Sequence, residues 1–143
     1  MRYWDSSALV PLLDKEKSTN QCETWLRSDP QIATWWLSRV ECASTFNRLN
    51  RDGDLKDADL RLALSDLETL SNSFVEILPV EAVRTVAVRL LRSHPLRTAD
   101  ALQLASAILA AGENRRELEF VSYDARLVEA ADREGFSCIA WPE

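Results

Sequence analysis

The feature that most constrains the fold is a regular alternation of short apolar segments with longer segments of helical periodicity. Apolar segments with the length and residue types of β-strands lie at residues 2–4, 31–35, 74–78, 118–123 and 136–141. Helical periodicity is found between them, for example where leucines recur every three or four positions in residues 56–70. Because helical crossovers separate the strands, we expect a three-layer α/β/α sandwich with a mainly parallel central sheet.

Polar residues mark the expected starts of three helices. Ser6 or Ser7 is predicted to cap the helix that follows the first strand. Ser38 and Glu41 match the S-x-x-E capping box at the start of a second helix. Thr98 is expected to cap a later helix that extends to residue 111. These boundaries place several polar side chains immediately after strands.

The length and composition restrict the class of protein. A chain of 143 residues with 46% hydrophobic and 28% charged residues is typical of one globular domain, which we expect to span residues 1–143. No apolar run reaches the roughly 20 residues of a membrane span, so a cytoplasmic protein without membrane contact is expected. The three cysteines form no C-x-x-C pair, and the three glycines cannot form a phosphate-binding loop.

The charge balance argues against a protein that binds nucleic acid through a broad basic face. The chain carries 23 acidic and 17 basic residues, for a formal net charge of −6. An acidic total remains compatible with a nucleic-acid substrate if carboxylates cluster around a metal ion and arginines line the rim. Whether the acids cluster at such a metal site must be judged from their positions in the sequence.

Four acids are expected to meet at one edge of the sheet. Asp5 and Asp124 each stand where a strand ends and a helix begins, and the carboxyl ends of parallel strands share an edge. Glu41 and Asp100 lie in first helical turns that can face the same edge. Asp100 also starts the apolar stripe of its helix, so we expect it to be buried and to need a partner.

Four converging carboxylates would repel one another unless a positive charge lay between them. Oxygen ligands, together with a single histidine in the chain, favour a hard cation such as Mg²⁺ or Mn²⁺. Such an ion can activate water and neutralise the charge that develops on a phosphodiester. The sequence therefore predicts phosphodiester hydrolysis.

Four sequence blocks resemble the acidic blocks of PIN-domain ribonucleases, in particular the VapC toxins of bacterial VapBC toxin–antitoxin pairs. They occur in the order found in that family and span nearly the whole chain: YWDSSALV (3–10), SRVE (38–41), RTADALQLA (97–105) and SYDARL (122–127). The resemblance implies a Mg²⁺- or Mn²⁺-dependent endoribonuclease that cleaves RNA, forms a homodimer and is inhibited by a small antitoxin protein.

The resemblance also implies roles for individual residues. Asp5, Glu41 and Asp100 would hold the principal metal directly or through water, and Asp124 would support a second metal or the attacking water. Ser6 and Ser122 match positions where the family often has Ser or Thr, and they could tune the carboxylates by hydrogen bonding. Several arginines could contact RNA phosphates or simply lie on solvated helix faces: Arg39, Arg84, Arg89, Arg92 and Arg97. Arg97 is the best candidate for a phosphate contact because it lies three residues from Asp100.

Each acid also has an ordinary structural explanation. Asp5 could be a turn residue, Asp124 a helix N-cap, Glu41 part of a capping box, and Asp100 a complement to a helix dipole. Two alternatives apply to the whole chain. One is a catalytically silent PIN-like module that binds protein or RNA, and the other is a receiver-like phosphoacceptor domain with one strand-end aspartate as the acceptor.

Overall fold

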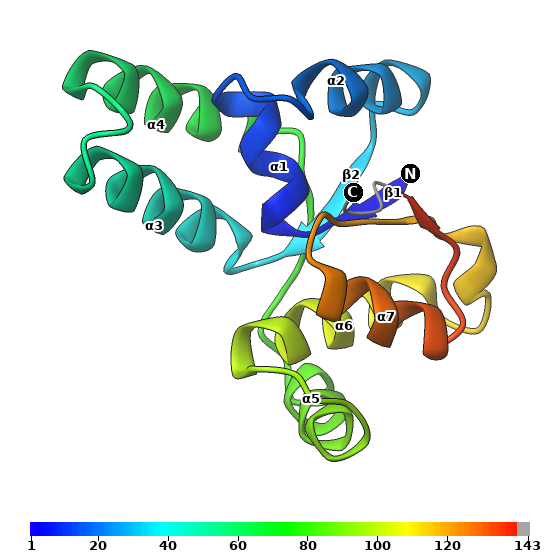
Figure 1. Cartoon of the computed structure of the whole chain (residues 1–143). Coiled ribbons are helices and arrows are strands. Elements are labelled where there is room, and N and C mark those ends of the chain that lie inside the picture. Colours follow the sequence, from blue (N-terminus) through cyan, green and yellow to red (C-terminus); the bar gives the residue numbers. More distant parts are fainter. Residues whose placement is uncertain (140–143) are drawn as a thin grey trace.

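The computed structural model describes residues 1–139, in which a central sheet lies between two layers of helices (Figure 1). The strands within this range are β1 (Arg2–Trp4), β2 (Ile32–Trp35), β3 (Val75–Ile77), β4 (Phe120–Val121) and β5 (Cys138–Ile139). The helices are α1 (Ser6–Leu13), α2 (Thr19–Ser28), α3 (Ser38–Arg51), α4 (Asp57–Ser71), α5 (Glu81–Ser93), α6 (Thr98–Ala111) and α7 (Ala125–Arg133). None of these helices is long and apolar enough to cross a lipid bilayer.

The sheet has the strand order β3-β2-β1-β4-β5, and all four pairings are parallel. β1 is the central strand, because Tyr3 lies opposite Ala33 of β2 on one side and Phe120 of β4 on the other. Parallel pairing gives every strand the same direction, so the loops that follow the strands all open at one edge.

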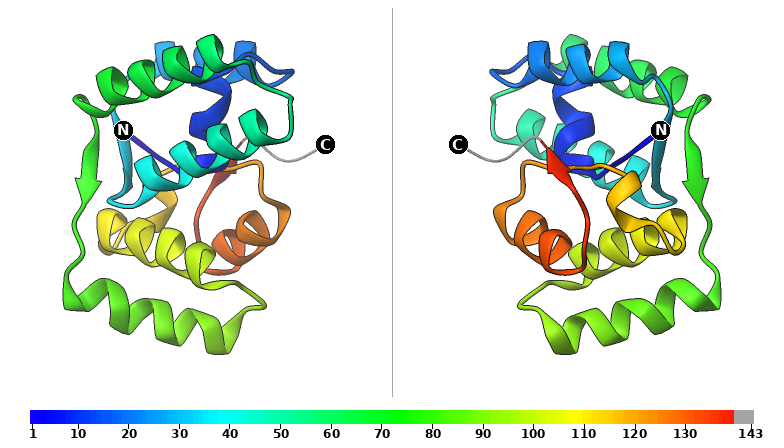
Figure 2. Two further views of the ribbon diagram at one scale, coloured as in Figure 1. Left: turned by 90° about the vertical axis from the view of Figure 1, so that its left-hand side faces the viewer. Right: turned by 90° about the vertical axis from the view of Figure 1, so that its right-hand side faces the viewer.

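The two faces of the sheet form separate apolar cores. Tyr3 packs in a cluster with buried residues of α5, α6 and α7, whereas the next residue, Trp4, packs in a cluster with α1, α2, α3 and α4. This alternation follows from the two-residue period of a strand. Figures 1 and 2 show the two groups of helices on opposite sides of the sheet. The predicted α/β/α sandwich with a parallel sheet is therefore confirmed.

The strands are shorter than predicted at the carboxyl half of the chain. β4 spans only two residues of the predicted segment 118–123, so Ser122 and Asp124 lie in the loop that follows it. The last strand was predicted over 136–141; in the described residues it begins at Cys138 and not at position 136, and positions 140 and 141 lie outside the described residues. A short 3₁₀ helix, Arg115–Glu117, was not predicted.

The predicted helix caps are wrong at three helices. Asp5, Leu37 and Arg97 occupy the N-cap positions of α1, α3 and α6, and the residues that follow them are already helical. Ser6, Ser38 and Thr98 are thus first helical residues, and Ser38 does not form a capping box with Glu41. The hydroxyl groups of Ser6 and Ser38 are instead available to contact other elements, which becomes important at the acidic edge of the sheet.

Candidate active site

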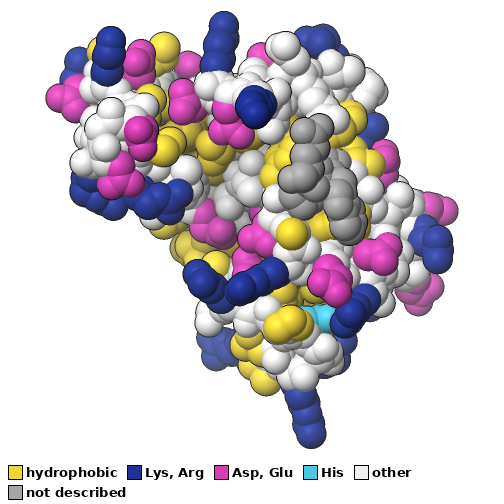
Figure 3. All heavy atoms as spheres, viewed as in Figure 1, with side chains coloured by type: hydrophobic (Ala, Val, Ile, Leu, Met, Phe, Trp, Pro, Cys, Tyr) yellow, Lys and Arg dark blue, Asp and Glu magenta, His cyan; other side chains and the backbone are white. Residues whose placement is uncertain are grey.

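The four predicted acids meet at the carboxyl edge of the sheet. Asp5 directly follows β1, Asp124 lies in the loop after β4, and Glu41 and Asp100 lie in the first turns of α3 and α6. All four line one cavity of about 410 Å³. Figure 3 shows Asp and Glu side chains gathered in the hollow between the two helical layers, with Lys and Arg side chains at its border.

Asp5 is the most buried of these acids, with only 4% of its surface exposed. Its Oδ1 accepts a hydrogen bond from the Ser7 hydroxyl at 2.8 Å. The Ser7 oxygen in turn accepts a hydrogen bond from the backbone N–H of Tyr123 and lies 3.3 Å from the Ser122 hydroxyl. The turn after β1 is thereby tied to the turn after β4, which fixes the position of Asp5.

Glu41 is held by two neutral donors from different elements. The Ser6 hydroxyl donates to its Oε2 at 3.0 Å, and Nε2 of Gln103 donates to its Oε1 at 3.0 Å. These contacts replace the predicted capping box as the explanation of Glu41. Because both donors are uncharged, they orient the carboxylate without neutralising it.

Gln103 is a site residue that sequence reasoning missed. It is 1% exposed and joins three elements, because its Oε1 accepts from the Tyr3 hydroxyl while its Nε2 donates to Ser38 and Glu41. The available signal was a polar residue three positions after Asp100 on the inward face of an otherwise apolar helix. Such a buried amide needs several partners, and the acidic edge supplies them.

Asp100 and Asp124 lie nearer the surface. Asp100 lies at the start of the buried face of α6, as predicted, but its side chain is only partly buried, and its Oδ2 accepts the backbone N–H of Arg97 at 3.3 Å. Asp124 is the N-cap of α7, where its Oδ1 accepts the backbone N–H of Leu127 at 3.1 Å. The structural explanation considered for Asp124 therefore holds, and capping engages only one of its two oxygens.

The four carboxylates have no basic partner among residues 1–139, since none of them forms an ion pair there. Burial raises the pKa of Asp5 to about 7, and the charge of Glu41 contributes. Burial and the charge of Asp100 raise the pKa of Glu41, and burial and the charge of Asp124 raise the pKa of Asp100. The pKa values of Asp5, Glu41 and Asp100 are thus each raised in part by the negative charge of a neighbouring acid, an arrangement that favours binding of a positive charge.

The remaining predicted residues separate into those at the site and those away from it. Ser6 and Ser122 lie beside it, where Ser122 accepts the backbone N–H of Asp124 at 3.0 Å. Arg97 borders Asp100 and Asp124. Arg89 instead pairs with Glu134 and Arg84 with Glu81, so these two arginines are engaged elsewhere.

Three further charged side chains at the site were not predicted. Glu16, in the loop between α1 and α2, and Arg48, on α3, both line the acidic cavity. Arg126, on α7, borders Asp100 and Asp124 together with Arg97. Glu16 and Arg48 carried no sequence signal, because neither lies at a strand end or in a recognisable block.

The donor set fits a hard divalent cation. Apart from Arg48, the polar side chains that line the acidic cavity all carry an oxygen atom that could bind a metal, and neither histidine nor cysteine is among them. No three acidic, histidine or cysteine side chains in the described part of the chain are close enough together to form a complete ligand set. An ion bound here would therefore keep part of its water shell, as Mg²⁺ usually does.

Comparison with known proteins settles the family. A model of the PIN domain matches residues 2–133. The chain belongs to the PIN-domain family. One relative of this PIN domain is Ribonuclease VapC47 of Mycobacterium tuberculosis (strain CDC 1551 / Oshkosh), which is 33% identical over 141 residues, or 95% of this chain and 93% of the relative. The family resemblance inferred from the four sequence blocks is confirmed.

Solved structures agree with this PIN fold. FitAcB from Neisseria gonorrhoeae superposes with a TM-score of 0.67 at 15% identity and covers 96% of both chains. A toxin–antitoxin complex from Klebsiella pneumoniae superposes with a TM-score of 0.57 at 20% identity and covers 88% of both chains. At these identities the likeness concerns the fold alone.

Replacing Asp5 with Asn should stabilise the metal-free PIN domain at high pH. Because the folded-state pKa of about 7 lies above the unfolded value of 3.8, the wild type should lose stability as the pH rises from about 4 to 7. Asn cannot ionise, so the variant should not lose stability in this way. Its free energy of unfolding should exceed that of the wild type by on the order of 2 kcal/mol at pH 8, with little difference at pH 4. Urea unfolding with chelator present measures the free energy of unfolding of both proteins at each pH.

The exposed Asp54 provides a matched control, because it lies outside the acidic cavity. Asp54→Asn should change the free energy of unfolding by less than about 0.5 kcal/mol at either pH. An Asp5→Asn gain that is absent, or equal at both pH values, would contradict the account of Asp5.

Proposed function

We propose that this PIN domain is an endoribonuclease and acts as the toxin of a type II toxin–antitoxin module. The observation that carries the proposal is the set of four carboxylates that line one cavity without a basic partner in the described residues. A relative that matches 95% of the chain and bears the name ribonuclease supports the substrate class. The substrate is RNA, and the reaction is hydrolysis of its phosphodiester bonds.

We infer that Asp5, Glu41, Asp100 and Asp124 hold Mg²⁺ or Mn²⁺ at the carboxyl edge of the sheet. Such an ion activates a water molecule and neutralises the charge that develops on the phosphodiester. The raised pKa values of Asp5, Glu41 and Asp100 support the inference, because a cation would favour their charged forms. Asp124 lines the same cavity, and its Oδ2 accepts no hydrogen bond from the described residues, so this oxygen could support a second ion or the attacking water.

The neutral hydrogen bonds at the site give it a fixed shape before substrate arrives. Ser7 orients Asp5, and Ser6 and Gln103 orient Glu41. Catalytic groups that are already in place lose little energy to reorganisation during the reaction. Ser6, Ser7 and Gln103 therefore act as positioning residues, while the four acids are the candidate catalytic residues.

The proposed reaction predicts metal-dependent cleavage of RNA by the partner-free protein. Total bacterial RNA should yield discrete fragments with Mg²⁺ or Mn²⁺ and none with chelator. Asp100→Asn should reduce the rate by about a hundredfold or more, because it removes a charge that faces the cavity. Gel analysis of the fragments measures the rate.

Asp54→Asn, on an exposed turn, should cleave like the wild type. Full cleavage by Asp100→Asn would disprove the metal-site assignment. If the folded wild type binds RNA but does not cleave it, the chain is instead the silent binding module considered above.

We propose that the toxin forms a homodimer and binds a small antitoxin protein. A toxin–antitoxin complex among the structural neighbours supports a protein partner. Exposed apolar side chains at the β3 edge of the molecule, including Trp36, Val40 and Leu78, are available for protein contacts.

The assembly is tested by light scattering coupled to gel filtration. The protein alone should have the mass of a dimer at micromolar concentration. Coexpression with the product of a small adjacent reading frame should give a larger complex that lacks ribonuclease activity. A monomeric mass would contradict the dimer, and failure of the two proteins to copurify would contradict the antitoxin proposal.

A further inference from the structure

Three adjoining cavities run along the carboxyl edge of the sheet. The central cavity contains all four acids. On one side, a second cavity shares Asp100 and Asp124 with it and adds Arg97 and Arg126. A third cavity of about 550 Å³ shares Glu41 and Arg48 with the central one. Arginine thus lies beside Glu41 in one layer of helices and beside Asp100 and Asp124 in the other.

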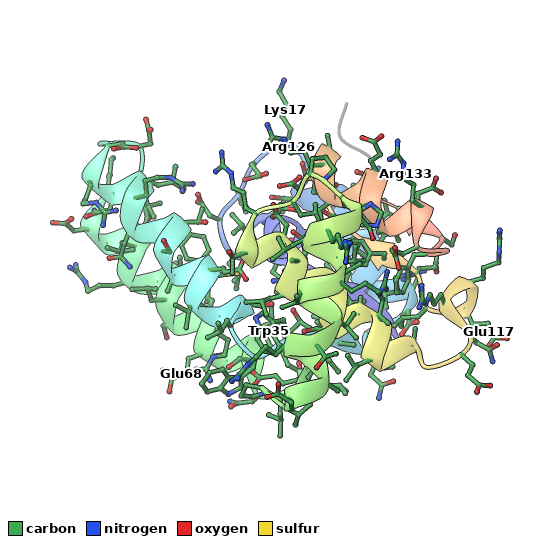
Figure 4. All side chains as sticks on the ribbon, turned by 90° about the horizontal axis from the view of Figure 1, so that it is seen from below. Lys17, Trp35, Glu68, Glu117, Arg126 and Arg133 are labelled. Carbon is green, nitrogen blue, oxygen red and sulfur yellow. The ribbon has the colours of Figure 1, made fainter. Side chains whose placement is uncertain are left out.

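The three bordering arginines differ from the arginines that stabilise the fold. Arg2 pairs with Glu119, and Arg89 and Arg115 pair with Glu134. In contrast, the guanidinium groups of Arg48, Arg97 and Arg126 have no ion pair or hydrogen bond within residues 1–139. All three side chains are exposed, and Figure 4 labels Arg126 near the start of α7. They are free to bind an external anion.

Arg97 and Arg126 are close enough to Asp100 for their charges to act on it. Their positive charges lower the pKa of Asp100, although burial and the charge of Asp124 outweigh them. Arg48 lies two helical turns after Glu41 on the same side of α3. The two positive borders therefore belong to different layers of the sandwich, with the acidic centre between them.

We propose that these borders bind the RNA backbone on either side of the phosphate to be cleaved, with Arg48 at one end and Arg97 and Arg126 at the other. The inference rests on the proposed function and adds a path for the strand across the site. A chain of net charge −6 repels a polyanion overall, so local cations must hold it. Guanidinium groups bind phosphate through a planar fork of donors.

The strand path is tested by the salt dependence of RNA binding. The full chain carrying Asp5→Asn would be titrated into a fluorescent single-stranded RNA between about 50 and 200 mM salt. Arg48→Ala and Arg126→Ala should each reduce the slope of log affinity against log salt by about 0.7, the value for one phosphate contact in a single strand. Arg48→Lys should keep the slope, because it keeps the charge.

Arg61→Ala is the matched control, since Arg61 is exposed on α4 and borders none of the three cavities. It should leave the slope unchanged. An unchanged slope in Arg48→Ala or Arg126→Ala, an equal decrease in Arg61→Ala, or no RNA binding at all would overturn the proposal. Loss of antitoxin binding with unchanged RNA binding would also overturn it and assign the arginines to the protein partner.

The proposed nuclease activity can fail independently of this result. If the slopes change as expected but the wild type cleaves no RNA with Mg²⁺ or Mn²⁺, the strand path is retained and the catalytic proposal is rejected. If the wild type cleaves RNA and the slopes do not change, the catalytic proposal is retained and the strand path is rejected.

Discussion

The parallel hydrogen bonding of β1 to both β2 and β4 is the constraint on which the site depends. It brings the turn after β1 beside the turn after β4, although the two are separated by more than 110 residues in the chain. Asp5 and Asp124 thereby reach the same edge, and the crossover helices α3 and α6 add Glu41 and Asp100. Without parallel pairing, these acids would point to opposite ends of the sheet.

Ionising several acids at one edge of the sheet is unfavourable in free energy, and hydrogen bonds from neighbouring side chains reduce this penalty. Asp5 is almost fully buried, and a buried carboxylate without a basic partner resists ionisation. Hydrogen bonds from Ser7 to Asp5 and from Gln103 to Glu41 keep the charged forms accessible. The absence of ion pairs at these four acids, within the described chain, leaves their charge available to a cation and hence to the proposed chemistry.

The sequence predicted the layers and the edge of the sheet well, because both follow from local periodicity. The alternation of apolar segments with amphipathic helices was enough to predict that Asp5 and Asp124 share an edge. The sequence identified Asp124 as a possible N-cap but did not predict the start of α3, since Ser38 and Glu41 satisfy the capping-box pattern and instead form hydrogen bonds with Gln103 from α6. Contacts between residues more than 60 positions apart leave no periodic signal.

The dependence on contacts between distant residues also explains which arginines the sequence could identify as site residues. Arg97 was found because it adjoins Asp100 in sequence, whereas Arg48 reaches the acidic cavity only because α3 crosses that edge. Arg89 was a candidate for the same role on sequence grounds, but it is bound to Glu134 in a cluster with His94 and Arg115. Which cations are free and which are paired is a property of tertiary packing, and the sequence alone does not specify it.

Calorimetric titration of the folded protein with Mn²⁺ tests most directly whether the acidic edge is a metal site. The account predicts binding to the wild type and to Asp54→Asn, with affinity weakened about tenfold or more in Asp5→Asn and Asp100→Asn, because each loses a charged oxygen ligand. Equal affinity in all four proteins, or no binding to a wild type shown to be folded, would contradict the account.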